Sequence, residues 1–399
     1  MQHRTRVRLE ETLSGKLTMH TATDRTAPST GTGRSLDDLV RDDATTSREL
    51  VDTALIEFFA SRTEQVAALG DGYVAAVREL TDFVIRGGKR IRPAFAWTAW
   101  LGAGGHRSSD GAGSVLRACA ALELVQACAL IHDDIIDSSV TRRGFPTVHV
   151  GFARRHRDAK WSGSSERFGE SAAILLGDLA LCWADDMFRE SGIEAAAFAR
   201  VSPVWSAMRT EVLGGQLLDI EAEAGLDESV DAAMRVNRYK TAAYTVERPL
   251  QIGAALAGAR PELTAAYRSF GTDIGLAFQL RDDLLGVFGD PAVTGKPSGD
   301  DIREGKRTVL MAVGMALADR HAPSSAQKLR ASLGSGDLSD GDTMEVRTIL
   351  TELGAVADIE RRIGELTDRA LTTLASSGTE PDAAAKLRAM AIAATQRTY

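Results

Sequence analysis

The sequence Leu130-Ile-His-Asp-Asp-Ile-Ile-Asp137 ends a long apolar stretch that contains no turn residue. An apolar stretch of this kind favours a helix, and on a helix Asp133 and Asp137 lie one turn apart on the same face. Asp134 is rotated about 100° away from them. Like charges at this spacing repel each other, so a helix that keeps both is typical of a site where a cation lies between them. The alternative is a solvated helix end.

The rest of the chain predicts helices on both sides of this stretch. The 399 residues are 44% apolar, 26% charged and only 6% aromatic, with 10 prolines, a composition that favours helix over sheet. Apolar residues recur at helical spacing from Leu36 onward. Alternating strands and Asn-Gly turns are not found. The sequence therefore predicts an all-α protein, with a polar disordered leader at 1–33 and one domain over 34–399.

Charge and cysteine usage argue against several classes of function. The formal net charge is −8 and no basic stripe with interleaved aromatics occurs, so nucleic acid is not an expected partner. Cys119, Cys128 and Cys182 form no CxxC pair, so neither a disulfide framework nor a zinc site is expected. No run approaches the ~18 apolar residues that span a membrane, and the N-terminus lacks a secretory signal. We expect a cytoplasmic protein without stable membrane insertion.

A second acidic pair follows another apolar helical run, in Gln279-Leu-Arg-Asp-Asp-Leu-Leu-Gly286. Mg²⁺ prefers oxygen ligands and is usually held by one or two carboxylates together with substrate phosphates. Asp282 and Asp283 are therefore candidates for facing the first aspartate group across a cavity. Taken alone, the pair is explained as well by a solvated turn.

Cationic segments accompany the two acidic groups. Arginine binds a diphosphate as a fork and lysine as a point charge, so such segments are candidates for binding anions. For each segment alone, an ordinary basic loop or a lysine that reaches the solvent is the alternative. The segments are Arg86-Gly-Gly-Lys-Arg-Ile-Arg-Pro93, Thr141–His149, Tyr239-Lys240-Thr241 and Gly295-Lys296-Pro297. Taken together, acidic groups and cationic segments predict a site for two diphosphates and Mg²⁺.

These motifs resemble, in their order and spacing, the trans-type polyprenyl (isoprenyl) diphosphate synthases, most like the bacterial geranylgeranyl diphosphate synthases. The resemblance runs from about Arg86 to Lys306 and includes Gly-Gly-Gln-Leu-Leu-Asp219. It implies a single large helical bundle of the isoprenoid synthase type around a central cavity. It also implies condensation of isopentenyl diphosphate, head to tail, with an allylic diphosphate (dimethylallyl, geranyl or farnesyl). The family is commonly homodimeric, so we expect a homodimer that pairs through the helical stripes before the first motif.

For metal binding, the resemblance implies Asp133 and Asp137 as ligands of two Mg²⁺ ions and Asp282 as the ligand of a third. One position departs from the family, because the second motif of many members ends in aspartate and this chain has Gly286. A helix puts Gly286 one turn after Asp282, so that face lacks a carboxylate. We expect Asp282 to suffice, because the first aspartate of the motif is the one that reaches the metal.

For substrate binding, the resemblance assigns cationic and amide side chains to the two diphosphates and hydroxyl or amide oxygens to the developing carbocation. The assignments are Lys89, Arg92 and Arg143 for isopentenyl diphosphate, with Gln126 where many members have His; Arg142, Lys240 and Lys296 for the allylic diphosphate; and Thr241 and Gln279 for the carbocation. Catalysis would then depend on neutralising the leaving diphosphate as its charge develops.

The residues just before the first aspartate group predict the length of the product. Cys128 and Ala129 stand where aromatic rings stop chain growth early in the family, and here both are small. With Val125 they leave an apolar tunnel open. We expect a product longer than farnesyl (C15), with geranylgeranyl (C20) as the first expectation, and a tunnel floor made by Trp183 and Met187.

Two other classes of protein remain open. A class I terpene cyclase also uses an aspartate-rich motif in an all-α fold, but it has no second diphosphate to bind, and its second metal motif is of the Asn/Ser/Glu type. A non-catalytic regulatory subunit of a synthase usually lacks one acidic group or the basic segment. This chain keeps both acidic groups and the basic segment.

Overall fold

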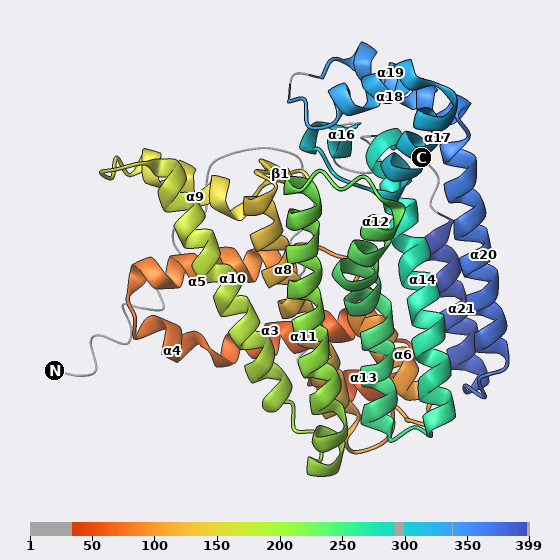
Figure 1. The fold of residues 1–399 in the computed structure, drawn as a ribbon. Helices are drawn as coiled ribbons and strands as arrows, with labels where there is room; N and C mark the ends of the chain where they lie inside the picture. The colour runs from red at the N-terminus through yellow and green to blue at the C-terminus, as the bar shows by residue number, and fades with distance from the viewer. Residues whose placement is uncertain (1–33, 291–298, 337, 397–399) are drawn as a thin grey trace. The chain divides into compact units, whose positions relative to one another are not determined.

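Figure 1 shows the computed structural model of the protein, which describes residues 34–290, 299–336 and 338–396. Contacts divide the chain into Met1–Ser35 and Leu36–Tyr399, and every described helix and strand lies in the second unit. The predicted leader at 1–33 and the predicted diphosphate ligand Lys296 lie outside the described residues. The leader, the domain boundary and the role of Lys296 therefore stay predictions.

Helices follow one another along the described chain with short connections. The first half contains α2 (Leu36–Arg41), α3 (Ser47–Ser61), α4 (Thr63–Ala67), α5 (Asp71–Ile85), α6 (Ile91–Gly102), α7 (Ala112–Ala120), α8 (Leu122–Ile136), β1 (Thr141–Arg142), β2 (Phe145–Pro146), α9 (Val148–Asp158) and α10 (Ser165–Arg189). The second half contains α11 (Ala195–Ala224), α12 (Val230–Val236), η1 (Asn237–Glu247), α13 (Arg248–Ala257), α14 (Pro261–Phe288), α16 (Asp300–Glu304), α17 (Val309–His321), α18 (Pro323–Ser332), α19 (Asp340–Glu352), α20 (Ala355–Ala375) and α21 (Pro381–Thr395).

The predicted all-α fold is confirmed, apart from one short hairpin among the described residues. β1 pairs antiparallel with β2, with Thr141 opposite Pro146. Arg143 and Gly144 form the turn with φ of 54° and 78°, the positive values that a two-residue hairpin turn requires. The sequence did not reveal this turn because a bulky residue rarely adopts positive φ. The hairpin fixes the two adjacent arginines, Arg142 and Arg143, directly after α8.

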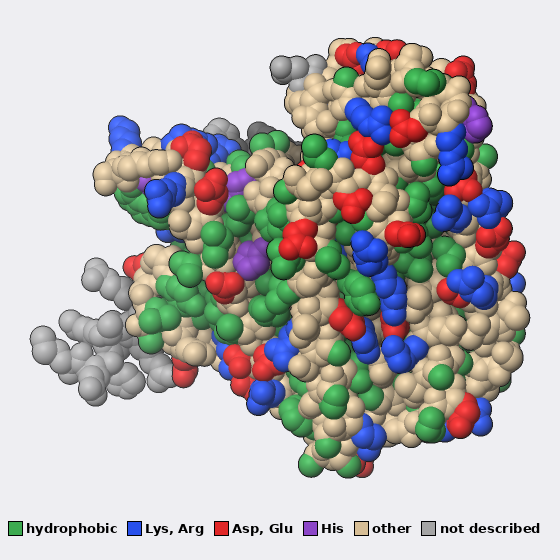
Figure 2. Space-filling view, in the orientation of Figure 1, with side chains coloured by type: hydrophobic (Ala, Val, Ile, Leu, Met, Phe, Trp, Pro, Cys, Tyr) green, Lys and Arg blue, Asp and Glu red, His purple; other side chains and the backbone are tan. Residues whose placement is uncertain are grey.

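The helical stripes before the first motif are buried in the chain's own core. Leu50, Val51 and Leu55 of α3 are fully covered, where α3 packs against α7. These side chains are therefore not available for the dimer interface that the sequence had suggested. Exposed apolar side chains gather instead on α10 and α11, as Figure 2 shows, and comprise Ile174, Leu175, Leu213, Leu217 and Ile220.

One stretch, Ala112–Ile136 over α7 and α8, is long and apolar enough to cross a membrane by length and composition, with a mean hydropathy of 1.7. The expectation that no run reaches this length is wrong. Because 72% of the stretch's most apolar window is buried inside the fold, the stretch has the character of a core helix. Its burial follows from its neighbours, since α8 packs against α10, α5 and α6.

The segment η1 is a π-helix, and two glycines let its neighbours approach it closely. A Cβ atom at Gly215 of α11 would lie 2.2 Å from the backbone nitrogen of Lys240, and one at Gly275 of α14 would lie 2.6 Å from Cα of Ala242. Larger residues at either position would push η1 away. π-turns occur frequently at functional sites, and the helical periodicity of the sequence does not distinguish them from α-turns.

Candidate active site

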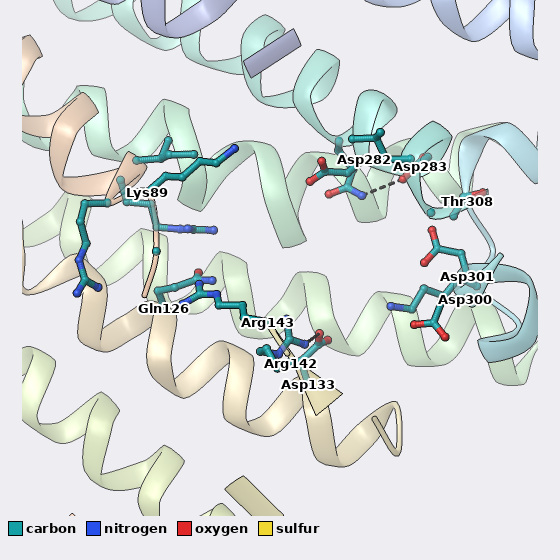
Figure 3. A pocket seen from close by; sticks show the side chains of 18 of the residues that line it. Lys89, Gln126, Asp133, Arg142, Arg143, Asp282, Asp283, Asp300, Asp301 and Thr308 are labelled. Carbon is teal, nitrogen blue, oxygen red and sulfur yellow. Dashed lines mark hydrogen bonds and ion pairs between the residues drawn. The ribbon is translucent and has the colours of Figure 1, made fainter. Parts of the chain in front are cut away.

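A cavity of about 1040 Å³ lies between the carboxyl ends of α8 and α14. Both helices end at the same side of the bundle, near α16 (Figure 1). Figure 3 shows the cationic segment around Lys89 at one side of the cavity and aspartates of α14 and α16 at the other. The lining brings together eight residues predicted from the sequence: Lys89, Arg92, Gln126, Asp133, Arg142, Arg143, Gln279 and Asp282.

The first aspartate group has the arrangement that helical phase predicts. Asp134 is fully buried, while Asp133 and Asp137 keep 18% and 11% of their side chains exposed. Asp134 Oδ1 accepts hydrogen bonds from Arg142 Nε at 2.7 Å and Nη2 at 2.6 Å. Burial raises the pKa of Asp134 against the opposing effect of Arg142. Asp134 therefore positions Arg142, which also lies 3.6 Å from Asp133 Oδ2.

Lys240 of η1 contacts the first aspartate group at Asp133. Its Nζ lies 3.1 Å from Asp133 Oδ1 and 2.6 Å from Asp219 Oδ2. Burial opposes the charge of Lys240, but the two carboxylates raise its pKa above the ordinary value. Burial also opposes ionisation of Asp133, and Lys240, Lys306 and Arg142 together still hold its pKa below the ordinary value. Asp133 is therefore an anion among cations.

Lys306 is a site residue that the sequence reasoning missed. Its Nζ lies 3.0 Å from Asp137 Oδ2 and 2.9 Å from Glu304 Oε2. Burial raises the pKa of Asp137, an effect that Lys306 reduces and the neighbouring Asp133 reinforces. The available signal was a lysine after Gly305, in a turn that precedes α17. Asp219, the last residue of the Gly-Gly-Gln-Leu-Leu-Asp motif, contacts Lys240 and so lies beside the predicted metal ligand Asp133.

The second aspartate group repeats the pattern of the first with different partners. Asp282 and Asp283 both line the cavity, but Asp283 is only 2% exposed. Asp283 Oδ1 accepts a hydrogen bond from Gln279 Nε2 at 2.8 Å, drawn as a dashed line in Figure 3. Burial raises the pKa of Asp283 to about 7. Asp283 therefore orients Gln279, as Asp134 orients Arg142.

A carboxylate from elsewhere occupies the space in front of Gly286. A Cβ atom at Gly286 would lie 1.8 Å from Asp301 Oδ2 and 2.3 Å from Asp301 Cγ. Asp301 and its neighbour Asp300, in the first turn of α16, both line the cavity. The face that lacks the third aspartate of the motif is thus supplied with carboxylate oxygen by α16.

The cationic segment before α6 divides into structural and cavity-facing members. Arg90 is 3% exposed and bonds Asp52 and Glu123 at 2.7 Å each. Arg86 pairs with Asp82 at 2.6 Å. Lys89, by contrast, is exposed to the cavity and has no ion pair within the described residues. It is therefore available to a substrate anion.

Arg143 is a second cation without an ion pair in the described part of the chain. Its guanidinium lies against the backbone of Gly87 and Gly88, where ideal Cβ atoms would approach Nη1 to 3.2 and 3.6 Å. Burial lowers the pKa of Arg143, and the neighbouring Arg142 lowers it further. A group that crowding makes less stable as a cation is stabilised when an anion binds there.

Gln126 and Arg92 meet on a tyrosine of η1. Tyr244 Oη donates to Gln126 Oε1 at 2.8 Å, and the Arg92 guanidinium lies 4.1 Å from the centre of the Tyr244 ring. Arg92 Nη2 donates to Thr245 Oγ1 at 2.8 Å, and its buried Nε has no hydrogen-bond partner among the described residues. The predicted Thr241 follows Lys240 in η1 but is not among the described residues that line the cavities.

The donor set fits Mg²⁺. Among the described residues, no three His, Cys, Asp or Glu side chains come together closely enough to hold a metal unaided. Mg²⁺ does not require this, because one or two carboxylates and substrate phosphates usually hold it. The lysines that now lie against Asp133 and Asp137 show that both carboxylates attract positive charge at this point.

A second, narrower cavity of about 80 Å³ extends behind Asp133. Its lining includes Val125, Cys128 and Ala129 of α8, as expected for a tunnel. The lining residues found among the described ones do not include Trp183 or Met187. These two residues lie outside this cavity, and the floor stays a prediction. Trp183 packs edge-to-face on Phe58 and Phe59 at 6.0 Å, and Met187 is buried in the same core cluster.

Comparisons with known proteins agree with this geometry. Residues 74–350 match the family model described as "Polyprenyl synthetase". A short chain isoprenyl diphosphate synthase of Methanothermobacter thermautotrophicus is 35% identical over 262 residues, 65% of this chain and 72% of that protein. A geranylfarnesyl diphosphate synthase of Aeropyrum pernix is 33% identical over 287 residues, 71% of this chain and 82% of that protein.

A solved structure is also similar across most of the chain. The geranylgeranyl pyrophosphate synthase of Corynebacterium glutamicum, complexed with isoprenyl diphosphate and magnesium, superposes with a TM-score of 0.86 at 50% identity. The match covers 88% of this chain and 99% of that one. With two aspartate groups and a separate cationic segment around one cavity, this chain belongs to the polyprenyl synthetase family of prenyl-transferring enzymes.

Proposed function

We propose that the protein condenses isopentenyl diphosphate with an allylic diphosphate, head to tail, to give an all-trans prenyl diphosphate, most simply geranylgeranyl diphosphate. The observation that carries this proposal is the division of one cavity into an acidic half and a separate cationic segment. Two diphosphates need two anion sites, and only one of them has to leave. The printed functions of the relatives and of the solved structure support the same reaction.

The acidic half would bind the leaving diphosphate. Asp133, Asp137 and Asp282 would hold Mg²⁺, which supplies positive charge to the diphosphate oxygens as the carbon–oxygen bond breaks. The proposal uses three ions, two at the first aspartate group and one at the second. Arg142, positioned by Asp134, adds a fixed guanidinium to the same anion.

Lys240 has a second task in this proposal. It now lies between Asp133 and Asp219, at the junction of the large cavity with the narrow one. A cation there would face the allylic diphosphate on arrival. Thr241 and Gln279 would direct oxygen dipoles at the allylic carbocation, which is the electrostatic stabilisation that such a transition state requires.

The cationic segment would bind the second substrate. Lys89 and Arg143 offer charges without protein ion pairs, and Arg92 offers a guanidinium braced on Tyr244. Gln126 lies on the same tyrosine. Isopentenyl diphosphate held here would present its double bond to the carbocation. The new bond forms between the terminal carbon of isopentenyl and the allylic carbon, and the proton is lost to the released diphosphate.

An assay that follows both substrates distinguishes this function from the terpene cyclase and the regulatory subunit. The protein is incubated with farnesyl and isopentenyl diphosphates and Mg²⁺, and both substrates are followed by mass spectrometry. Loss of both with formation of a longer prenyl diphosphate is the expected result. Loss of farnesyl diphosphate alone identifies a terpene cyclase, and loss of neither identifies a regulatory subunit. Either of these would overturn the proposal.

We also propose that the active species is a cytoplasmic homodimer. The exposed apolar side chains of α10 and α11 support a second copy as the partner, since Leu213, Leu217 and Ile220 follow the spacing of one helix face. Light scattering after gel filtration should give twice the chain mass of 42.6 kDa. Leu217→Glu should shift the protein towards the monomer.

A further inference from the structure

The narrow cavity behind Asp133 ends at a charged side chain. On α11, Gln216, Leu213 and Arg209 line it in succession, about one turn apart. Asp219, about one turn beyond Gln216, contacts Lys240 at the end nearest Asp133. From Asp219 to Arg209 the helix advances ten residues, about 15 Å at 1.5 Å per residue. Arg209 therefore lies at the deep end of the cavity, opposite the diphosphate site.

Arg209 is held firmly in that position. Its Nη1 lies 2.8 Å from Asp185 Oδ1, which also accepts a hydrogen bond from Trp205 Nε1 at 2.9 Å. The guanidinium lies 5.8 Å from the Trp205 ring, and that ring stacks on Phe188 with centres 4.5 Å apart and planes at 4°. The side chains of Arg209 and Asp185 are 30% and 25% exposed.

We propose that Arg209, held by Asp185 and Trp205, is the residue that stops chain growth and sets the length of the product. The proposal rests on the proposed prenyltransferase function. A growing hydrocarbon chain reaches this ion pair, whose side chains are both partly exposed. To pass it, the chain would have to displace the guanidinium from Asp185 or leave apolar carbon in contact with water. Both are unfavourable, so the chain stops there. The aromatic layer of Trp205 and Phe188 supports the ion pair from behind.

The position also explains why small residues on α8 do not leave the tunnel without an end. Cys128 and Ala129 are small side chains in the lining near Asp133, and Val125, about two turns of α8 before Asp133, lines the cavity further in. The stop is therefore contributed by α11 and α10, not by the helix that carries the first aspartate group. Arg209 Nε is buried without a hydrogen-bond partner among the described residues, so neither solvent nor a protein acceptor satisfies it.

The test compares product length in three full-length variants with each allylic primer. Arg209→Ala should raise the ratio of products longer than the wild-type product about tenfold or more, the range that pocket contacts supply in substrate discrimination. Arg209→Gln keeps a hydrogen-bond donor for Asp185 and should lengthen the product less. Arg189→Ala is the matched control, because Arg189 binds the same Asp185 at 2.8 Å but does not line the cavity.

Folding is checked by thermal unfolding, and Asp185 should remain compensated in Arg209→Ala because Arg189 and Trp205 still contact it. A folded, active Arg209→Ala or Arg209→Gln enzyme with the wild-type product distribution would overturn the assignment while leaving the prenyltransferase function intact. A change of equal size in Arg189→Ala would do the same. A wild-type protein that elongates no primer would overturn both proposals.

Discussion

The two aspartate groups begin alike and differ in how each is completed. In both, the second aspartate is buried and holds a neighbouring side chain: Asp134 holds Arg142, and Asp283 holds Gln279. The first group has its last carboxylate on its own helix, at Asp137. The second has Gly286 at that place, and Asp301 of another helix fills the space. Tertiary structure thus brings a carboxylate to the place where the local pattern lacks one, so Gly286 alone does not argue against the predicted metal site.

The largest effect is expected where the first group carries the most charge. Asp133→Asn removes a proposed Mg²⁺ ligand and also the partner of Lys240 at 3.1 Å. We expect kcat/KM to fall about 100-fold or more, and more than in Asp282→Asn, because only Asp133 has both roles. Steady-state kinetics over a range of Mg²⁺ concentrations measures both variants. Asp43→Asn, at a residue whose side chain is 93% exposed, is the control and should be neutral.

The buried second aspartates should differ in stability. Asp134→Asn removes the carboxylate that binds Arg142 at 2.6–2.7 Å and leaves it only the weaker contact with Asp133 at 3.6 Å, so it should lower the free energy of unfolding by about 3 kcal/mol. Asp283→Asn replaces a carboxyl whose partner is a neutral amide, and should cost less than about 1 kcal/mol. Urea unfolding at pH 6 without Mg²⁺ measures both. Equal losses would contradict the distinction between a charged and a neutral partner.

Asp283 also predicts in which direction the stability of the protein changes with pH. Burial raises its pKa in the folded protein to about 7 from the ordinary value of 3.8, so the unfolded chain releases this proton first. The wild type should therefore lose stability from this group as pH rises from about 4 to 7, and Asp283→Asn should not. The stability difference between variant and wild type should accordingly move in the variant's favour at higher pH. A difference independent of pH would contradict this.

Restoring the family residue at position 286 should be harmful on its own. Gly286→Asp brings side-chain atoms onto the Asp301 carboxylate, so we expect a loss of about 1–3 kcal/mol in stability and weaker dependence of activity on Mg²⁺. The double variant Gly286→Asp, Asp301→Gly should recover most of both. A double-mutant cycle measures the coupling. Additive losses would mean that the two positions do not share one space.

Substitutions behind the two aspartate groups are expected to have the smallest effect on rate but a clear effect on product length. Cys128 lines the narrow cavity behind the first group, so Cys128→Phe should shorten the product with a modest change in rate. Phe278 lies four residues before Asp282 of the second group. It is not among the described residues that line the narrow cavity. Phe278→Ala should leave product length unchanged. Mass spectrometry of the products from each primer decides, and an unchanged product in Cys128→Phe would reject the tunnel assignment.

Local pattern was enough for much of this site. The 3.6-residue period placed Asp133 and Asp137 together and turned Asp134 away, because helical phase depends only on neighbours in sequence. Residues that act across the fold could not be found that way. Asp301 reaches Gly286 because α16 packs on α14, and Lys306 reaches Asp137 from far along the chain.

The tunnel shows the same limit. Trp183 and Met187 were expected at its floor because they are bulky and stand one turn apart on α10. They face the core beside Phe58, whereas Arg209 of α11 meets the cavity. Which side of α10 faces the cavity depends on how α10 packs against α8 and α9, and no single-helix pattern contains that information.

Because η1 is a π-helix, the orientation of Lys240 depends on how many residues this segment contains. Its i→i+5 hydrogen bonds accommodate more residues per turn than an α-helix, and α12 and α13 continue it without a break. Loss of one residue between Asn237 and Lys240 would let the segment relax to an α-helix while the flanking helices keep their packing. The lysine would rotate about 100° around the axis, away from Asp133 and Asp219. A single-codon deletion here is thus expected to move Lys240 out of the proposed site while the flanking helices keep their fold.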